Sequence, residues 1–368
     1  MSATGVTGAA TSVTGSSLLP WLEAPLAQAL HATRGHALLI HGPQGVGQFE
    51  LALAVAAATL CEGEASVRPG GRACGHCSAC HLIAARTHPD LLVLVPEVLQ
   101  LALGWSGADE AGEEEGASKS KAKPSKEIRV AAVRAAIAFA QQTTSRGGAK
   151  FVVLYPAERM NPTSANMLLK TLEEPPGQAR FILGSAAPQR LLPTVRSRCQ
   201  VLRLPLPGAQ LAIRWLQSRG VAEPQVVLAA AGGQPMDVIE RLALGCDAQA
   251  WQRLPREVLA GQGTTLAAWP LPMVVDALQK LCHDALACAV GAAPRYFAAA
   301  SVAGGGDVAR LTACARTLRE AARNAEHPLN APLGIEALVQ TLHRALRSPA
   351  AVSSSRERAS PLATLRRP

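Results

Sequence analysis

The segment ALLIHGPQGVGQFELALAVAAATL, residues 37–60, joins three patterns that together indicate one kind of fold. An apolar run of strand length at residues 37–40 comes first, a glycine-rich turn at residues 42–47 follows, and a helical pattern covers residues 49–60. A short apolar run without alternation is typical of a strand in a parallel sheet that is covered on both faces. The segment therefore predicts a strand, a tight turn and a helix of an α/β domain.

Further apolar runs of strand length occur along the first 205 residues, with helical patterns between them. The clearest helix starts at Asn161, a good N-cap, with Pro162 at its first position, and the pair Pro175-Pro176 stops it. Strands that alternate with helices predict a parallel sheet. The predicted strands after the first are residues 91–95, 151–154, 181–183 and 201–204.

The glycine-rich turn has the spacing of a nucleotide-binding P-loop, with Gly42, Gly45 and Gly47 in place. A working P-loop then uses a lysine to reach the β and γ phosphates and a serine or threonine to hold Mg²⁺. Gln48 and Phe49 stand at those two positions. We therefore predict that the turn is kept while functional ATP binding is lost. On this motif alone, a glycine-rich turn of no nucleotide ancestry is an alternative.

The strand at residues 151–154 shows a second loss. A P-loop ATPase carries a carboxylate at the end of a neighbouring strand to hold Mg²⁺, and usually a second to orient the attacking water. Tyr155 and Pro156 stand there instead, and Glu158 could imitate such a carboxylate only from a displaced position. With four catalytic groups missing, we predict that the chain by itself is not an enzyme.

Four of the nine cysteines form the pattern C-x12-C-x2-C-x2-C. The short spacings let one turn deliver three thiolates to an ion, and the first cysteine can close a tetrahedron from the end of the preceding helix. We predict a structural Zn²⁺ site with no open position for water, and an iron–sulfur cluster is the rival interpretation. The predicted ligands are Cys61, Cys74, Cys77 and Cys80.

Two longer runs resemble a known family. NPTSANMLLKTLEEPP at residues 161–176 and LPTVRSRC at residues 192–199, together with the four-cysteine insertion, resemble bacterial clamp-loader AAA+ subunits of DNA polymerase III. Damaged nucleotide motifs beside an intact Ser197-Arg198-Cys199 resemble the ATP-inert member of that family. The resemblance places Ser185 and Ala186 where a γ-phosphate-sensing threonine pair is expected, and Met236 where an active subunit carries a sensing arginine.

The resemblance implies a function and a set of partners. It implies a non-hydrolysing subunit of the clamp loader, a part of the DNA polymerase III holoenzyme that helps to place the sliding clamp on primed DNA. Its partners would be the gamma/tau and delta subunits, with the clamp and the DNA reached through the assembled ring. Arg198 would be an arginine finger that reaches the ATP bound by the neighbouring subunit, since a guanidinium supplied in trans neutralises charge on the γ-phosphoryl group.

The domain boundaries follow from shifts in composition. After residue 207 strand-like runs stop and alanine- and leucine-rich helical periodicity continues. We predict a degenerate AAA+ domain, a helical lid and a helical collar between two disordered tails. The predicted ranges are 1–17 for the first tail, 18–207 for the AAA+ domain with a zinc module at 61–80 and a flexible insert at 104–127, 208–262 for the lid, 263–347 for the collar and 348–368 for the second tail.

Composition excludes some classes of protein. The chain has 368 residues, of which 48% are apolar and 17% charged, which is too hydrophobic for a disordered chain. Its longest apolar stretch, residues 51–61, is too short to span a membrane, and no lysine or arginine occurs among the first 33 residues, so we expect a cytoplasmic protein without a membrane segment. Two other functions stay open: an active gamma/tau-like ATPase and a zinc-dependent nucleic-acid binding module.

The net charge of +9 is unevenly spread. The predicted tail at residues 348–368 holds four arginines and one glutamate, hence +3, which leaves +6 for the rest of the chain. The body is therefore only mildly basic for its length. Its charge does not by itself indicate that the chain grips DNA.

Overall fold

The computed structural model describes residues 18–32, 35–64, 66, 68–105, 124–302, 306–325 and 330–347. The predicted tails and most of the predicted insert at 104–127 lie outside these ranges. The chain divides into two compact units, residues 1–243 and 244–368. No helix among the described residues has both the length and the hydropathy that a membrane span requires.

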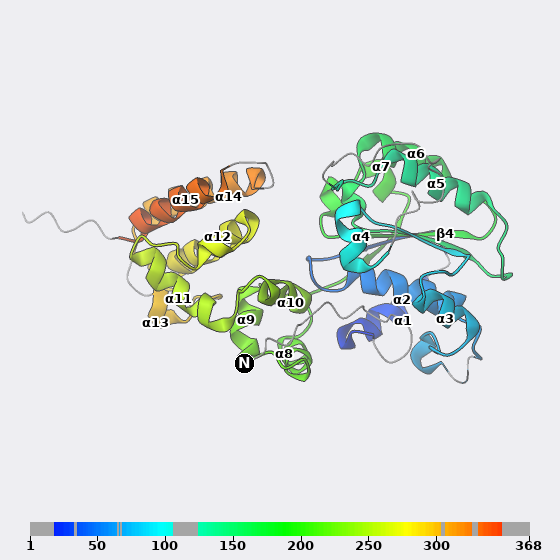
Figure 1. The fold of residues 1–368 in the computed structure, drawn as a ribbon, viewed down its shortest axis with the longest axis horizontal. Helices are drawn as coiled ribbons and strands as arrows, with labels where there is room; N and C mark the ends of the chain where they lie inside the picture. The colour runs from blue at the N-terminus through cyan, green and yellow to red at the C-terminus, as the bar shows by residue number, and fades with distance from the viewer. Residues whose placement is uncertain are drawn as a thin grey trace, which may run out of the picture. The chain divides into compact units, whose positions relative to one another are not determined.

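The first unit is built on a five-stranded sheet in which every pairing is parallel (Figure 1). The strand order is β2-β3-β4-β1-β5, so that β1 lies between β4 and β5. This confirms the predicted α/β fold with a P-loop-like parallel sheet. The strands are β1 (Ala37–His41), β2 (Leu91–Leu94), β3 (Lys150–Leu154), β4 (Ala179–Ser185) and β5 (Gln200–Arg203).

Helices cover both faces of this sheet (Figure 1). Alternate strand residues point to opposite faces, so Leu38 and Ile40 pack with one group of helices while Leu39 packs with the other. Because both faces are buried, the strand sequences are continuously apolar rather than alternating. One face carries α1 (Glu23–Ala32), α2 (Gln48–Leu60) and α3 (Ser78–Ala84), and the other carries α5 (Val130–Gln141), α6 (Pro162–Glu173) and α7 (Pro193–Arg196).

Local signals fix the start of α6 as the sequence predicts. The side chain of Asn161 accepts a hydrogen bond from the backbone N–H of Ser164 at 2.8 Å, and Pro162 occupies the first helical position. The cap satisfies one of the backbone donors that a helix start leaves without a partner. Leu168 and Leu172 then pack in the core on the face of the sheet that α5, α6 and α7 cover.

Between β2 and β3 the first unit contains one further helix, α4 (Glu97–Leu103). In the described residues after β5 every regular element is a helix. Those of the first unit are α8 (Ala209–Ser218), α9 (Pro224–Ala230) and α10 (Pro235–Ala243). The second unit contains α11 (Ala248–Leu259), α12 (Leu271–Ala289), α13 (Ala299–Val302), α14 (Val308–Asn324) and α15 (Ala331–Leu346). The units divide between residues 243 and 244, inside the range predicted for the lid, and the lid and collar boundaries stay predictions.

Candidate functional site

The glycine-rich turn leaves the carboxyl end of β1 and opens α2, at the edge of a parallel sheet where ligands ordinarily bind. Gly45 and Gly47 have φ angles of 71° and 99°, in the left-handed region that favours glycine. A Cβ atom on Gly45 would lie 2.9 Å from the backbone nitrogen of Asp237 in α10. The turn thus depends on glycine at these positions, and α10 packs directly against it.

The side chain of Gln48 is bonded inside the turn. Its Nε2 donates hydrogen bonds to the carbonyl oxygens of Gly42 at 2.8 Å and Pro43 at 2.7 Å, and the residue is only 1% exposed. A P-loop lysine would instead extend toward the phosphates. The side-chain amide carries no positive charge, and both of its N–H groups donate to the turn itself. Its Nε2 therefore has no hydrogen left to donate to a phosphate.

Two aromatic rings occupy the positions at which the sequence pattern expects the Mg²⁺ ligands of an ATPase. Phe49, 3% exposed, contacts Tyr155 at the end of β3, with the ring centroids 5.2 Å apart. Burial raises the pKa of Tyr155 well above its usual value, so the phenol stays neutral. A neutral phenol and a phenyl ring do not provide the hard anionic oxygens that Mg²⁺ prefers.

Glu158, three residues after Tyr155, is the carboxylate nearest to that residue in sequence, and it is engaged elsewhere. Its Oε1 accepts the backbone N–H of Ala186 at 3.0 Å, while its Oε2 is buried and has no hydrogen-bond partner among the residues that the structure describes. Ser185 is fully buried, and its hydroxyl accepts the N–H of Ala187 at 3.1 Å. Both groups therefore hold the loop after β4.

The start of α10 closes over the turn. The backbone N–H of Met236 donates to the carbonyl of Gly45 at 3.2 Å, and its side chain packs against the core that contains α2. Where the family resemblance expects a cationic sensor of nucleotide, this chain has an apolar side chain and a backbone contact.

A buried acid at the start of α2 was not anticipated from the sequence. Burial, with a smaller repulsion from Glu240, raises the pKa of Glu50 to about 7. The available signal was that Glu50 is the only acidic residue in the stretch 37–60. A carboxyl with a raised pKa is an indicator of function only in a site that can bind something, and this one is packed against the closed turn.

The four predicted metal ligands come together at the other end of α2. Their sulfur atoms all lie within 4.8 Å of one another, and the pairs Cys61–Cys77 and Cys74–Cys80 are each separated by 3.9 Å. A tetrahedron with Zn–S bonds of about 2.3 Å has sulfur atoms about 3.8 Å apart, so the donor set fits one such ion. An iron–sulfur cluster would need its cysteines spread around several irons and sulfides.

Backbone N–H groups point at these sulfur atoms. The N–H of Cys74 donates to the Cys61 sulfur at 3.2 Å, that of Cys77 to the Cys74 sulfur at 3.3 Å, and that of Cys80 to the Cys77 sulfur at 3.4 Å. The N–H of His76 is the main cause that lowers the pKa of Cys74 to about 6, whereas burial raises the pKa of Cys80. Such donors stabilise the thiolate form that a metal requires.

Arg198 follows α7, away from the glycine-rich turn and the cysteines in the sequence. Its Nε donates to Oε1 of Glu173 at 2.6 Å, its Nη2 contacts the same oxygen, and its Nη1 donates to the carbonyl of Thr194 at 2.8 Å. The side chain remains 31% exposed. The guanidinium is thus oriented by the end of α6 while part of it faces solvent.

Comparison with known proteins identifies the family. A family model described as DNA polymerase III, delta subunit, matches residues 21–207, which is more than half of the 368 residues. The chain belongs to this family. The match covers the sheet, both ends of α2 and Arg198.

Several relatives carry related names. DNA polymerase III subunit delta' of Pseudomonas aeruginosa is 40% identical over 224 residues, or 60% of each chain, and that of Escherichia coli is 37% identical over 217 residues, or 58% of this chain and 56% of the relative. The chain thus spans about 60% of the length of these relatives. DNA polymerase III subunit tau of Salmonella typhimurium is 29% identical over 164 residues, 45% of this chain and 21% of tau.

Proposed function

We propose that this member of the DNA polymerase III delta-subunit family acts as a delta-prime-type subunit of a bacterial clamp loader, a ring member that does not itself hydrolyse ATP. It would assemble with gamma/tau and delta subunits and help to place the sliding clamp on primed DNA. The relatives named delta' support the subunit type. The observation that carries the inert role is the closed turn, in which Gln48 bonds the loop and Phe49 contacts Tyr155.

The rival function, an active ATPase like gamma or tau, requires a nucleotide-binding turn. Calorimetric titration of the full chain with Mg-ATP separates the two, because the active form predicts saturable binding while the filled turn predicts none up to millimolar nucleotide. A dissociation constant in the micromolar range would refute the inert role.

Arg198 would act on the ATP of a neighbouring subunit. Its partial exposure and its fixed orientation on Glu173 support this role, since a finger must be both reachable and pre-positioned. A guanidinium that neutralises the transferring γ-phosphoryl group can be worth about 10³ to 10⁵ in rate.

The finger is tested in the reconstituted complex. Arg198→Ala should lower ATP turnover by up to about 10³ at the one site it serves, while gel filtration still recovers the whole complex. Arg196→Ala, which removes an exposed arginine two residues earlier, is the matched control and should leave turnover unchanged. Equal turnover in both variants would rule out the finger.

The four-cysteine site would hold a structural Zn²⁺. All four donors come from the chain, which leaves no position for a reacting water. Elemental analysis of the purified full chain should find one zinc per chain, and stoichiometric iron with acid-labile sulfide would contradict the assignment. If the chain were a zinc-dependent nucleic-acid binding module instead, it would bind DNA alone, with a steep loss in salt and on removal of zinc.

A further inference from the structure

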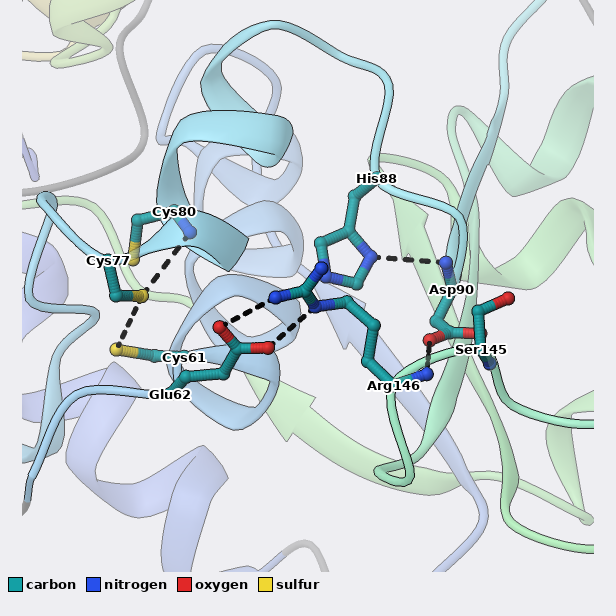
Figure 2. Close-up of polar contacts among 8 residues, drawn as sticks. All are labelled: Cys61, Glu62, Cys77, Cys80, His88, Asp90, Ser145 and Arg146. Carbon is teal, nitrogen blue, oxygen red and sulfur yellow. Dashed lines mark hydrogen bonds and ion pairs between the residues drawn. The ribbon is translucent and has the colours of Figure 1, made fainter.

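An ion pair joins the cysteine module, residues 61–80, to a loop far along the chain (Figure 2). Glu62 follows the first cysteine at the end of α2, and Arg146 lies in the loop before β3. The Nε of Arg146 donates to Oε1 of Glu62 at 2.6 Å and its Nη2 donates to Oε2 at 2.9 Å. This two-point geometry fixes the relative orientation of the two side chains, which a single contact would not.

The backbone of the same loop is fastened to the sheet. Fully buried Asp90, directly before β2, accepts the backbone N–H of Arg146 at 3.1 Å and that of Ser145 at 2.9 Å (Figure 2). Asp90 also pairs with Lys150, the first residue of β3, at 3.2 Å. Arg146 therefore connects to the amino-terminal edge of the sheet by its backbone and to the cysteine module by its side chain.

Glu62 in turn is joined directly to one of the four cysteines. It follows Cys61 in the chain, and the sulfur of Cys61 lies 3.9 Å from that of Cys77. The connection therefore runs from Asp90 through Arg146 and Glu62 to Cys61. An exposed ion pair alone contributes little to stability, but this one has a fork geometry, one of its residues adjoins a cysteine of the cluster, and the other is fastened to Asp90 through its backbone.

We propose that Arg146 is a positioning residue for the metal site and that, through Glu62, metal binding and the order of residues 143–148 are linked. The ion pair, anchored on the sheet, positions the cysteine module for the metal, and the bound metal in turn stabilises the loop. Such a linkage is reciprocal, because one coupling free energy describes both the effect of the metal on the loop and the effect of the loop on metal binding. The linkage rests on the proposed Zn²⁺ site and is independent of the proposed role in clamp loading.

The first test is metal affinity. The full chain, stripped of metal, is titrated with Zn²⁺ in competition with a chelator of known affinity. Arg146→Gln should weaken Zn²⁺ binding by about tenfold, the range seen for outer-shell partners of metal ligands. The matched control is Arg129→Gln, which breaks another ion pair of the first unit, in which Nη2 of Arg129 lies 2.8 Å from Oε1 of Glu97. This control should bind Zn²⁺ as the wild type does. Affinity of Arg146→Gln within twofold of wild type would overturn the proposal.

Two further variants separate positioning from a loss of folding. Arg146→Lys keeps the charge but loses the fork, and should fall between wild type and Arg146→Gln. Glu62→Gln should weaken Zn²⁺ binding as Arg146→Gln does, and the double variant should be no weaker than the worse single one, because both break the same contact. Fully additive losses would show that the two residues act separately and would overturn the proposal.

Hydrogen exchange gives a readout that metal affinity does not. In the wild type, Zn²⁺ should slow exchange of the amides of Ser145 and Arg146, which bond to Asp90. Arg146→Gln keeps both amides and their acceptor, so the loop should still fold, but the metal-dependent slowing should vanish. Slowing that persists in this variant would mean that the coupling does not pass through the arginine, and the proposal would fail.

Discussion

The two ends of helix α2 show opposite outcomes for a site in one small domain. At its amino end a glycine-rich turn has the sequence spacing of a P-loop, but Gln48 bonds the turn and Phe49 packs on Tyr155. At its carboxyl end four thiols lie within 4.8 Å of one another with backbone donors aimed at them. Side chains fill one end with internal contacts, and at the other end they bring four donor atoms together. A glycine-rich backbone turn therefore says little about binding until the side chains around it are placed.

The largest effect should come from removing a ligand at the carboxyl end. Cys80 is fully buried, and Cys80→Ser leaves three thiolates with a weak fourth donor. Zn²⁺ affinity should fall by more than about 100-fold, beyond the range of outer-shell changes. Chelator competition measures it, and Cys246→Ser, a buried cysteine outside the cluster, should keep full affinity. If Cys80→Ser binds metal normally, the two ends of α2 do not differ as described.

The next effect concerns the packing that fills the amino end. Phe49→Ala removes a buried ring and leaves a cavity beside Tyr155, so the free energy of unfolding should fall by about 3–5 kcal/mol. Chemical denaturation measures the change. Phe49→Leu, which keeps most of the volume, should lose less, and neither variant should alter zinc content. A loss below about 1 kcal/mol for the alanine variant would mean that the ring is not part of the packed core.

A smaller effect is expected in the pH dependence of stability. Glu50 has a pKa of about 7 when folded, against 4.5 for the free side chain, so between these values the unfolded chain releases a proton that the folded chain retains. Stability should therefore fall as pH rises from about 4.5 to 7, by at most about 3 kcal/mol, and change no further above 7 through this group. Glu50→Gln should flatten this slope and be the more stable form at pH 8. Denaturation midpoints of the wild type and of Glu50→Gln at a series of pH values measure this dependence. If the slope of stability against pH were the same in both, Glu50 would not be a buried neutral carboxyl.

The smallest effect is an expected failure to regain function. Gln48→Lys restores the P-loop lysine, yet Phe49 and Tyr155 still lie at the metal position and Met236 still bonds Gly45. Calorimetry should detect no Mg-ATP binding at micromolar nucleotide. If this single change gave micromolar affinity, Gln48 alone would block the site, and the amino end would be one substitution from a working P-loop.

Much of the fold was accessible from the sequence because its signals are local. Five apolar runs predicted five strands, and the ends of each predicted strand lie within two residues of the ends of a strand in the sheet. Asn161 and Pro162 predicted the start of α6 because a cap and a fixed φ act on neighbouring residues. The short cysteine spacings likewise predicted three ligands in one turn. These features depend on residues close together in the chain.

The contacts that define the sites were not accessible in this way. Nothing near Glu62 in the sequence indicates a partner 84 residues later, and Arg146 reaches it only because the loop before β3 is fastened to Asp90. The pairing of Arg198 with Glu173, 25 residues away, and the approach of α10 to Gly45 also join segments that are not neighbours in the sequence. The available hints, a carboxylate beside a metal ligand and an acid in an apolar helix, pointed to positions but not to partners.

The sequence by itself determined the parallel sheet, the glycine-rich turn followed by Gln48 and Phe49, and the four-cysteine pattern, because each depends on residue types at fixed short spacings. Tertiary structure alone decided what Gln48 and Phe49 contact and what surrounds the cysteine cluster. The ring contact of Phe49 with Tyr155 and the fork of Arg146 on Glu62 both join segments that meet only when the strands assemble. Burial and long-range geometry set those contacts, and neither is encoded in a local pattern.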